Sequence, residues 1–351
     1  MLAWVKVTRT FPAMCNKRIS SFEMAVSALS FVDACPPSIG FPYLGRMKVG
    51  VVHNPNAGRS DTSVAELFDH IRDAGHLPLE LNPTADLRTS PEFAEIDLLA
   101  IAGGDGTIRK IALQFVGSPL PLAIIPLGTA NNIGRSLGIT GKPRDVIMRW
   151  SQSEVRALDV GRAIGPWGNR LFLEAIGIGL VGRSIGILET IDERSTREFS
   201  DVEDKLQRDL AVFVALAAEM PPVRVELKAD GNDLSNDFLL LEILNIRHAG
   251  PRIELAPTAD PGDGLLDLVL ATQGDRDELK KTLLKGFSTS REPTFLGKQK
   301  ARSISLTMSQ GELRIDDKVM LSTPMNPDAR LPVKVEISIL PGALHALLPK
   351  G

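Results

Sequence analysis

The chain has 351 residues, of which 43% are hydrophobic and 24% are charged, a balance typical of a globular protein with room for two domains. Its formal net charge of −3 argues against a nucleic-acid-binding protein, because such proteins carry an excess of Lys and Arg. No apolar run approaches the roughly 18 residues of a transmembrane helix, and both cysteines precede Met47. We expect a cytoplasmic protein that could meet a membrane peripherally; no pattern indicates its oligomeric state.

Residues 1–46 differ from the rest of the chain. They lack a hydrophobic period and contain five basic residues against two acids. A basic, serine-containing targeting peptide and an upstream start codon both explain such a segment. A strand is expected directly after Met47, which favours the second explanation, so we interpret residues 1–46 as an N-terminal extension that is disordered or precedes the true start.

Short apolar runs alternate with amphipathic stretches from Met47 to residue 157. This pattern predicts strands at 48–53, 78–81, 97–102 and 122–125, and helices at 64–74, 91–94 and 108–115 with another ending at 137. Alternating strands and helices predict a doubly wound parallel α/β domain over residues 47–157, which the C-terminal segment 341–351 could complete.

The pattern changes in residues 158–340. Strands are expected at 170–175, 223–227, 238–245, 252–255, 265–271, 303–308, 312–315 and 333–340, with helices at 204–219 and 276–285. Turn residues separate most of these strands. The pattern predicts a second domain that resembles an antiparallel β-sandwich.

A glycine-rich loop follows the predicted buried strand at 97–102. Its residues are Gly103, Gly104, Asp105, Gly106 and Thr107. The glycines allow a ligand to approach the backbone, Thr107 could cap the next helix, and free amides at a helix start favour phosphate oxygens. Asp105 would repel phosphate unless it acted through a metal ion. The loop therefore predicts a nucleotide site that uses magnesium.

Two further polar loops, 54–59 and 126–132, follow the predicted strands at 48–53 and 122–125. In an open parallel sheet, loops at the carboxyl ends of strands meet at one edge, where ligands bind. We therefore expect all three loops to form one site.

These motifs carry a family resemblance. Asn54-Pro55, Gly103-Gly104-Asp105-Gly106-Thr107, Pro126-Leu127-Gly128-Thr129-Ala130-Asn131, the segment 255–260 and Asp263-Gly264-Leu265-Leu266-Asp267 resemble the diacylglycerol kinase catalytic domain of soluble bacterial lipid kinases and sphingosine kinases. NAD kinases share the first glycine motif but lack the Pro-Leu-Gly-Thr-Ala-Asn segment. The resemblance implies an ATP-dependent lipid kinase whose acceptor is the free hydroxyl of a diacylglycerol or sphingoid-like lipid, taken from a membrane surface.

The resemblance also implies residue roles. ATP contacts are expected from Asn54, Pro55, Asn56, Gly58, Arg59, Thr84, Gly103, Gly104, Asp105, Gly106, Thr107, Arg109, Gly128 and Thr129. Asp260, Asp263 and Leu265 resemble a loop that binds Mg²⁺, although without the family they indicate only a turn. Asp316 stands where the family has its catalytic aspartate, although spacing alone favours a hairpin tip at Asp316-Asp317.

The chain departs from the family at three places. Lys318 stands where the family usually has Glu, Asn132 replaces a frequent Asp, and Arg109-Lys110 replaces Asn-Glu. A catalytically weak or inactive homologue that binds nucleotide and lipid is therefore the alternative function. A remote alternative is an NAD(P)-dependent oxidoreductase, because the segment 177–182 matches the spacing of a dinucleotide fingerprint; no parallel strand is expected at the right interval after it.

Overall fold

A computed structural model describes residues 45–55, 57, 62–82, 91–194, 202–284, 299–323 and 332–350. Most of the predicted N-terminal extension lies outside the described residues. So do four of the predicted ATP-contacting residues, Asn56, Gly58, Arg59 and Thr84.

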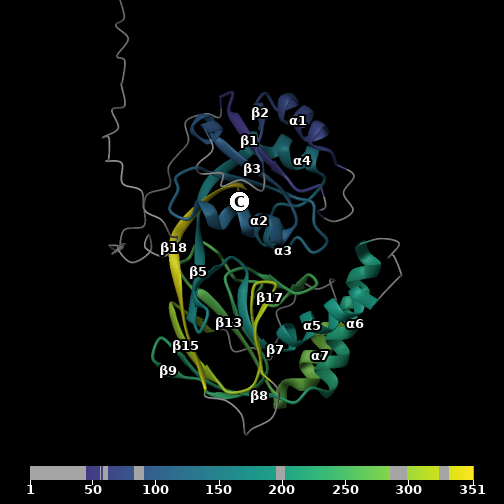
Figure 1. The fold of residues 1–351 in the computed structure, drawn as a ribbon, viewed down its shortest axis with the longest axis vertical. Coiled ribbons are helices and arrows are strands. Elements are labelled where there is room, and N and C mark those ends of the chain that lie inside the picture. The colour runs from purple at the N-terminus through teal and green to yellow at the C-terminus, as the bar shows by residue number, and fades with distance from the viewer. Residues whose placement is uncertain are drawn as a thin grey trace, which may run out of the picture. The chain divides into compact units, whose positions relative to one another are not determined.

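Four parallel strands form the first part of the main sheet (Figure 1): β1 (Lys48–His53), β2 (Leu77–Glu80), β3 (Leu98–Gly103) and β4 (Leu122–Pro126). Their order in the sheet is β4-β3-β1-β2. Every residue of β3 is buried, as expected of a strand that is covered on both faces.

Helices cover both faces of this parallel sheet. They are α1 (Val64–Asp73), α2 (Asp105–Ala112), α3 (Asn132–Ser136) and α4 (Pro143–Met148), with 3₁₀ turns at Pro91–Glu95, Leu113–Phe115 and Arg149–Gln152. Leu67 and Ile147 bury α1 and α4 in one apolar core, whereas Ile108 and Ile133 bury α2 and α3 in another. The doubly wound arrangement is therefore confirmed.

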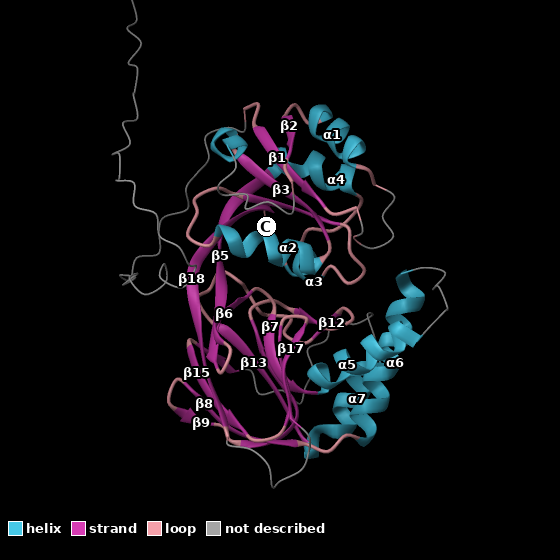
Figure 2. Ribbon diagram, viewed as in Figure 1, coloured by secondary structure: helices cyan, strands magenta, loops and turns pink. Residues whose placement is uncertain are grey.

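The second part is antiparallel and rich in β-structure (Figure 2). Its strands are β5 (Ser153–Gly165), β6 (Gly168–Phe172), β7 (Ala175–Gly179), β8 (Val223–Ala229), β9 (Asn232–Asp233), β10 (Asn236–Leu244), β11 (His248–Ala249), β12 (Ile253–Glu254), β13 (Leu266–Thr272), β14 (Gln299–Ala301), β15 (Ser303–Met308), β16 (Gly311–Ile315), β17 (Lys318–Thr323) and β18 (Val333–Pro349). The helices α5 (Leu180–Arg194), α6 (Val202–Glu219) and α7 (Arg276–Leu284) lie side by side.

The long strand β18 joins the two parts. It pairs with β15 and β5 in antiparallel register, and its Ala346 then pairs with Leu122 of β4 in parallel register. The side chain of Asp159 on β5 accepts from the amides of Gly264 and Gly342, over 2.7 and 2.8 Å, and so ties three segments together. The predicted division at residue 157 falls inside β5 and stays a prediction.

Two local predictions were wrong. Helix α2 begins at Asp105 rather than at residue 108, with Gly104 as its N-cap, so Thr107 lies in the first turn and does not cap the helix. The strand expected at 170–175 is two strands, because β6 ends at Phe172 and β7 begins at Ala175. Within the described residues, no helix is long and apolar enough to cross a membrane.

Candidate active site

The three predicted loops meet at one edge of the sheet. Strands β1, β3 and β4 are parallel, so the loops that follow them leave from the same edge. Asn54 Nδ2 donates to Thr107 Oγ1 over 2.8 Å, and thereby joins the first loop to the second. A Cβ atom added to Gly128 would lie 2.6 Å from the Cα of Gly104, so the second and third loops touch through their backbones. The three loops therefore lie together as expected, and their role as one binding site stays a prediction.

Asp105 organises the third loop. Its two carboxylate oxygens accept from the amides of Asn132 and Ile133, each over 3.0 Å, at the start of α3. Burial raises the pKa of Asp105, and the amides partly oppose that rise because they stabilise the ionised form. The sequence analysis explained the acid among the glycines only through a metal ion. The hydrogen bonds from these two amides are a second explanation, which it did not include.

Arg109 joins the glycine loop to the second part of the fold. It lies on α2, only 13% of its side chain is exposed, and it contacts three carboxylates. Its Nη1 is 3.3 Å from Glu174 Oε1, its Nε is 3.5 Å from Asp316 Oδ2, and its Nη2 is 2.5 Å from Asp317 Oδ1. The sequence predicted a contact with ATP for Arg109, but in this structure its guanidinium is occupied by carboxylates.

Asp316 lies at the tip of the β16–β17 hairpin, as its spacing predicted. Its backbone has a positive φ of 53°, and its Oδ1 accepts from the amides of Glu174 and Ala175 over 2.9 and 3.3 Å. Burial raises the pKa of Asp316 to about 6, although the Arg109 guanidinium and the two amides favour the ionised form. Asp316 is therefore a fixed, buried carboxylate that titrates near neutrality.

A buried ion pair between Arg314 and Glu242 supports the hairpin that carries Asp316. Arg314 donates to the backbone oxygen of Asp316 through Nη1, and its Nη2 is 2.5 Å from Glu242 Oε2. Glu242 is fully buried, and a Cβ atom on Gly177 would lie 2.2 Å from its Oε1. Sequence reasoning missed this pair, although an acid inside the otherwise apolar run 238–244 was a usable signal.

The structure agrees with the expectation that the segment 177–182 is not a dinucleotide-binding loop. Strand β7 pairs with β10 and β16 in antiparallel register, so no βαβ unit surrounds the segment 177–182. Its glycines serve packing: Gly177 leaves room for Glu242, and Gly179 has a φ of 87° and lies against the carbonyl of Leu239.

The predicted metal loop contains a lysine contact that the sequence did not suggest. Asp263 Oδ2 is 2.7 Å from Lys300 Nζ, its Oδ1 accepts from the amide of Leu265, and Asp260 Oδ1 accepts from the amide of Gly262. In the described ranges, no group of three or more His, Cys, Asp or Glu is arranged to hold a metal ion. Lys300 therefore holds one carboxylate oxygen of Asp263, and the Mg²⁺ role of Asp260, Asp263 and Leu265 stays a prediction.

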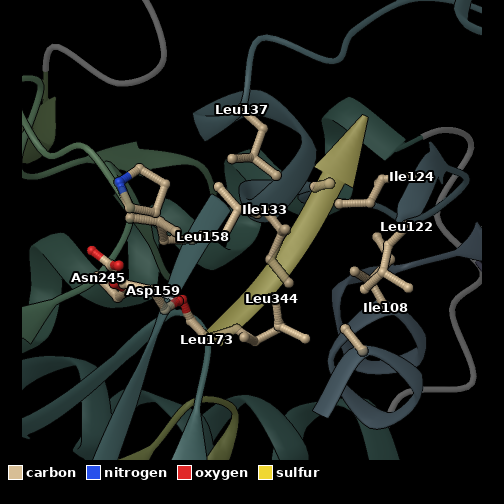
Figure 3. A pocket seen from close by; sticks show the side chains of 14 residues that line it. Ile108, Leu122, Ile124, Ile133, Leu137, Leu158, Asp159, Leu173, Asn245 and Leu344 are labelled. Carbon is tan, nitrogen blue, oxygen red and sulfur yellow. Dashed lines mark hydrogen bonds between the residues drawn. The ribbon is translucent and has the colours of Figure 1, made fainter. Parts of the chain in front are cut away.

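A small apolar cavity lies between α2, α3 and β18 (Figure 3). Leu137, Leu158 and Leu344 line it, together with Asp159 and Asn245. Its volume of about 30 Å³ corresponds to roughly one water molecule, so it is too small for an acyl chain. A larger open hollow of about 470 Å³ between α5 and α6 contains none of the predicted site residues.

Comparison with known proteins agrees with this geometry. Residues 48–163 match the family model of the diacylglycerol kinase catalytic domain, and residues 188–348 match that of the YegS C-terminal NAD kinase beta sandwich-like domain. The chain belongs to the family of diacylglycerol kinases and YegS-like lipid kinases.

Relatives in this lipid kinase family share about a quarter of their residues with the chain. The diacylglycerol kinase of Bacillus subtilis is 26% identical over 247 residues, which cover 65% of this chain and 75% of that protein. The "Probable lipid kinase YegS-like" of Pseudomonas putida is 26% identical over 321 residues, which cover 88% and 97%. A crystal structure of a diacylglycerol kinase from Bacillus anthracis has a TM-score of 0.60 at 20% identity, covers 86% of this chain and 96% of that chain, and so shares the fold.

Proposed function

We propose that the protein is an ATP-dependent kinase that transfers the γ-phosphoryl group to the hydroxyl of a lipid, either diacylglycerol or a sphingoid-like acceptor. One observation carries the proposal: Arg109, on the helix that begins at the glycine loop, lies 3.5 Å from the buried carboxylate of Asp316. Phosphate-binding amides and a candidate base thus meet at one site, as phosphoryl transfer requires.

The proposed chemistry assigns a task to each group. Backbone amides of the Gly104 and Gly128 loops would hold the phosphates of ATP, and an Mg²⁺ ion bound together with ATP would neutralise charge on the transferred group. Asp316 Oδ2 accepts the proton of the lipid hydroxyl. The hydroxyl oxygen then forms a bond to the γ-phosphorus, while the bond from that phosphorus to the β,γ-bridging oxygen breaks and ADP leaves. The proposed use of ATP agrees with a cytoplasmic location for the protein. The proposed lipid acceptor implies that the protein takes its substrate from a membrane surface.

A direct test is transfer of label from γ-labelled ATP to a panel of lipid alcohols in detergent micelles with Mg²⁺. We expect labelled product from at least one acceptor. The alternative function is that of an inactive homologue. It is favoured by the three carboxylate contacts of Arg109, because a guanidinium group that pairs with carboxylates is not directed at phosphate. ATP binding without transfer to any lipid would support that alternative and refute the kinase.

The rate of transfer should depend on pH through Asp316. The carboxylate must be ionised to accept a proton, and its pKa is about 6, so kcat should fall as the pH is lowered through about 6. Arg109→Gln removes the cation that favours ionisation, so the midpoint should move to higher pH. Profiles of kcat against pH for both proteins test this; an unchanged midpoint in Arg109→Gln would contradict it.

Gly128→Ala should weaken ATP binding by about tenfold or more, because overpacking of this size costs about 1–3 kcal/mol. The added Cβ would lie 2.6 Å from backbone rather than from a movable side-chain end, so the two loops must separate. Titration calorimetry with ATP measures the effect. Gly186→Ala on α5 is the control, because a Cβ atom there meets nothing within 4 Å; equal ATP affinity in both variants would rule out a role for the loop contact.

A further inference from the structure

Basic side chains gather beside the Gly128 loop, where α3 meets the segment that follows β10. Asn132 Nδ2 donates to the carbonyl of Gly250 over 2.9 Å, and the amide of Arg247 donates to Ser136 Oγ over 3.1 Å. These bonds hold the segment against α3. The four basic side chains of this place, here named the basic cluster, are Arg135, Arg247, His248 and Arg252.

Two guanidinium groups of the basic cluster share one backbone oxygen. Arg135 Nε and Arg252 Nε both donate to the carbonyl of Ala130, over 3.2 and 3.3 Å, and Arg252 Nη2 also donates to the carbonyl of Thr129 over 2.6 Å. Two like charges at this spacing repel each other unless an anion balances them. Burial and the charge of Arg135 both lower the pKa of Arg252, in agreement with this repulsion.

The protein supplies little negative charge to the cluster. Arg252 Nη1 is 3.4 Å from Glu203 Oε2, and the side chain of Glu203 is 55% exposed. Arg247 Nε donates to the carbonyl of Ala259. Among the residues that the structure describes, no carboxylate lies within 4 Å of the guanidinium of Arg135 or Arg247. Within the described residues, the guanidinium groups of the cluster therefore have one carboxylate within 4 Å, that of the exposed Glu203, and Asp105 acts on Arg252 from a greater distance.

His248 adds a hydrogen-bond donor rather than a charge. Burial, with the charges of Arg135 and Arg247, lowers the pKa of His248 to about 4, so its ring is neutral at pH 7. Ser136 Oγ accepts from the amide of Arg247 and lies 3.0 Å from His248 Nδ1, to which its hydroxyl can donate in one of the two tautomers of the ring. A neutral ring that accepts at Nδ1 carries its hydrogen on Nε2.

Backbone strain is concentrated at the same place. Asn131 and Arg252 have positive φ angles of 54° and 60°, which non-glycine residues seldom adopt. Such backbone conformations cluster at ligand sites and active sites. The backbone of Arg252 is thus held where its guanidinium can reach the Gly128 loop.

We propose that the basic cluster binds a phosphate group in the headgroup of the acceptor lipid. Guanidinium groups pair with phosphate through two parallel hydrogen bonds, and the Nε2 hydrogen of His248 can donate a further one. Arg247, His248 and Arg252 all come from the β-rich second part of the fold, whereas Arg135 lies on α3 of the first part. The inference rests on the proposed function, because it narrows the proposed acceptor from any lipid alcohol to a lipid alcohol that carries a phosphate group.

Binding measurements without turnover test this site. The ligands are a soluble short-chain phosphatidylglycerol, the matching diacylglycerol, inorganic phosphate and ATP, each titrated into the full-length protein. The variants are Arg135→Gln, which alters an exposed side chain, and the double variant Arg135→Gln/Arg247→Gln. Arg224→Gln is the matched control, because this arginine is exposed on β8 and pairs with Asp237, which is not part of the cluster.

We expect the double variant to bind the phosphate-bearing lipid about tenfold or more weakly, because hydrogen bonds to charged groups are lost. Arg135→Gln should show a smaller loss, and Arg224→Gln none, while the affinities for ATP and diacylglycerol stay within about twofold of wild type in every variant. If the binding of ATP were weakened equally, the cluster would be a nucleotide site. If only the binding of inorganic phosphate were weakened, it would be a site for free anions. Either result, or unchanged binding of every ligand, overturns the proposal. Wild type that binds the lipid but transfers no label would refute only the kinase function.

Discussion

Asp316→Asn should lower kcat by about 10²–10⁴-fold, the range typical of a lost general base. Asparagine has nearly the same shape, so its oxygen can still accept from the amides of Glu174 and Ala175. It cannot take a proton from the lipid hydroxyl. The affinity for ATP should therefore remain close to that of wild type. Steady-state kinetics with γ-labelled ATP, together with calorimetric titration of ATP, measure both quantities.

Asp317→Asn is the matched control for Asp316→Asn. Asp317 is the adjacent carboxylate at the same hairpin tip and contacts the same arginine, but 56% of its side chain is exposed. Because the Asp317 carboxylate faces solvent, its side of the ion pair is screened and contributes little, so we expect kcat to change only a few-fold. Comparable losses in the two variants would mean that the hairpin acts through its net charge, and that Asp316 is not the base.

Arg314→Met should lower the free energy of unfolding by about 3–5 kcal/mol, the usual cost of breaking a buried ion pair from one side. The substitution leaves Glu242 without its partner at a position with no solvent exposure. Burial already raises the pKa of Glu242, and loss of Arg314 should raise it further. A raised pKa in the folded state means that the folded protein keeps a proton that the unfolded chain has released. The variant should therefore regain stability as the pH falls.

Urea denaturation at several pH values measures these changes, and two further variants interpret them. The double variant Glu242→Met/Arg314→Met should recover most of the lost stability, because no buried charge remains. Arg224→Met, at an exposed arginine on β8, should stay within about 0.5 kcal/mol of wild type. If Arg314→Met were as stable as this control, the ion pair would not support the Asp316 hairpin.

Local chemistry accounts for what the sequence predicted well. The glycine loop, the turn at Asn54 and the hairpin tip at Asp316 each depend on a few adjacent residues, and the sheet then brings the loops together. The partners of Arg109 depend on tertiary structure instead. Glu174 and Asp317 lie 65 and 208 residues away along the chain, so spacing held no information about them.

Other differences have physical causes of the same kind. The sequence analysis explained Asp105 by a metal ion that it would hold. In the structure, Asp105 accepts hydrogen bonds from two amides at the start of α3, which lie 27 and 28 residues further along the chain. Strand β7 was hidden because its two glycines, needed for packing against β10, imitate a dinucleotide loop. The basic cluster was missed because its residues are dispersed and become a group only when α3 meets the segment after β10.

The pairing of β18 has a consequence for how the protein is made. In the parallel sheet, β4 finds its outer neighbour in β18, more than 200 residues later in the chain. While the ribosome is still producing the intervening β-rich residues, the edge of β4 lacks that strand. An unpaired edge is prone to pairing with other chains. The parallel part of the sheet therefore gains its β18 neighbour only after the β-rich residues between β4 and β18 have been synthesised, so its folding is tied to that of the second part.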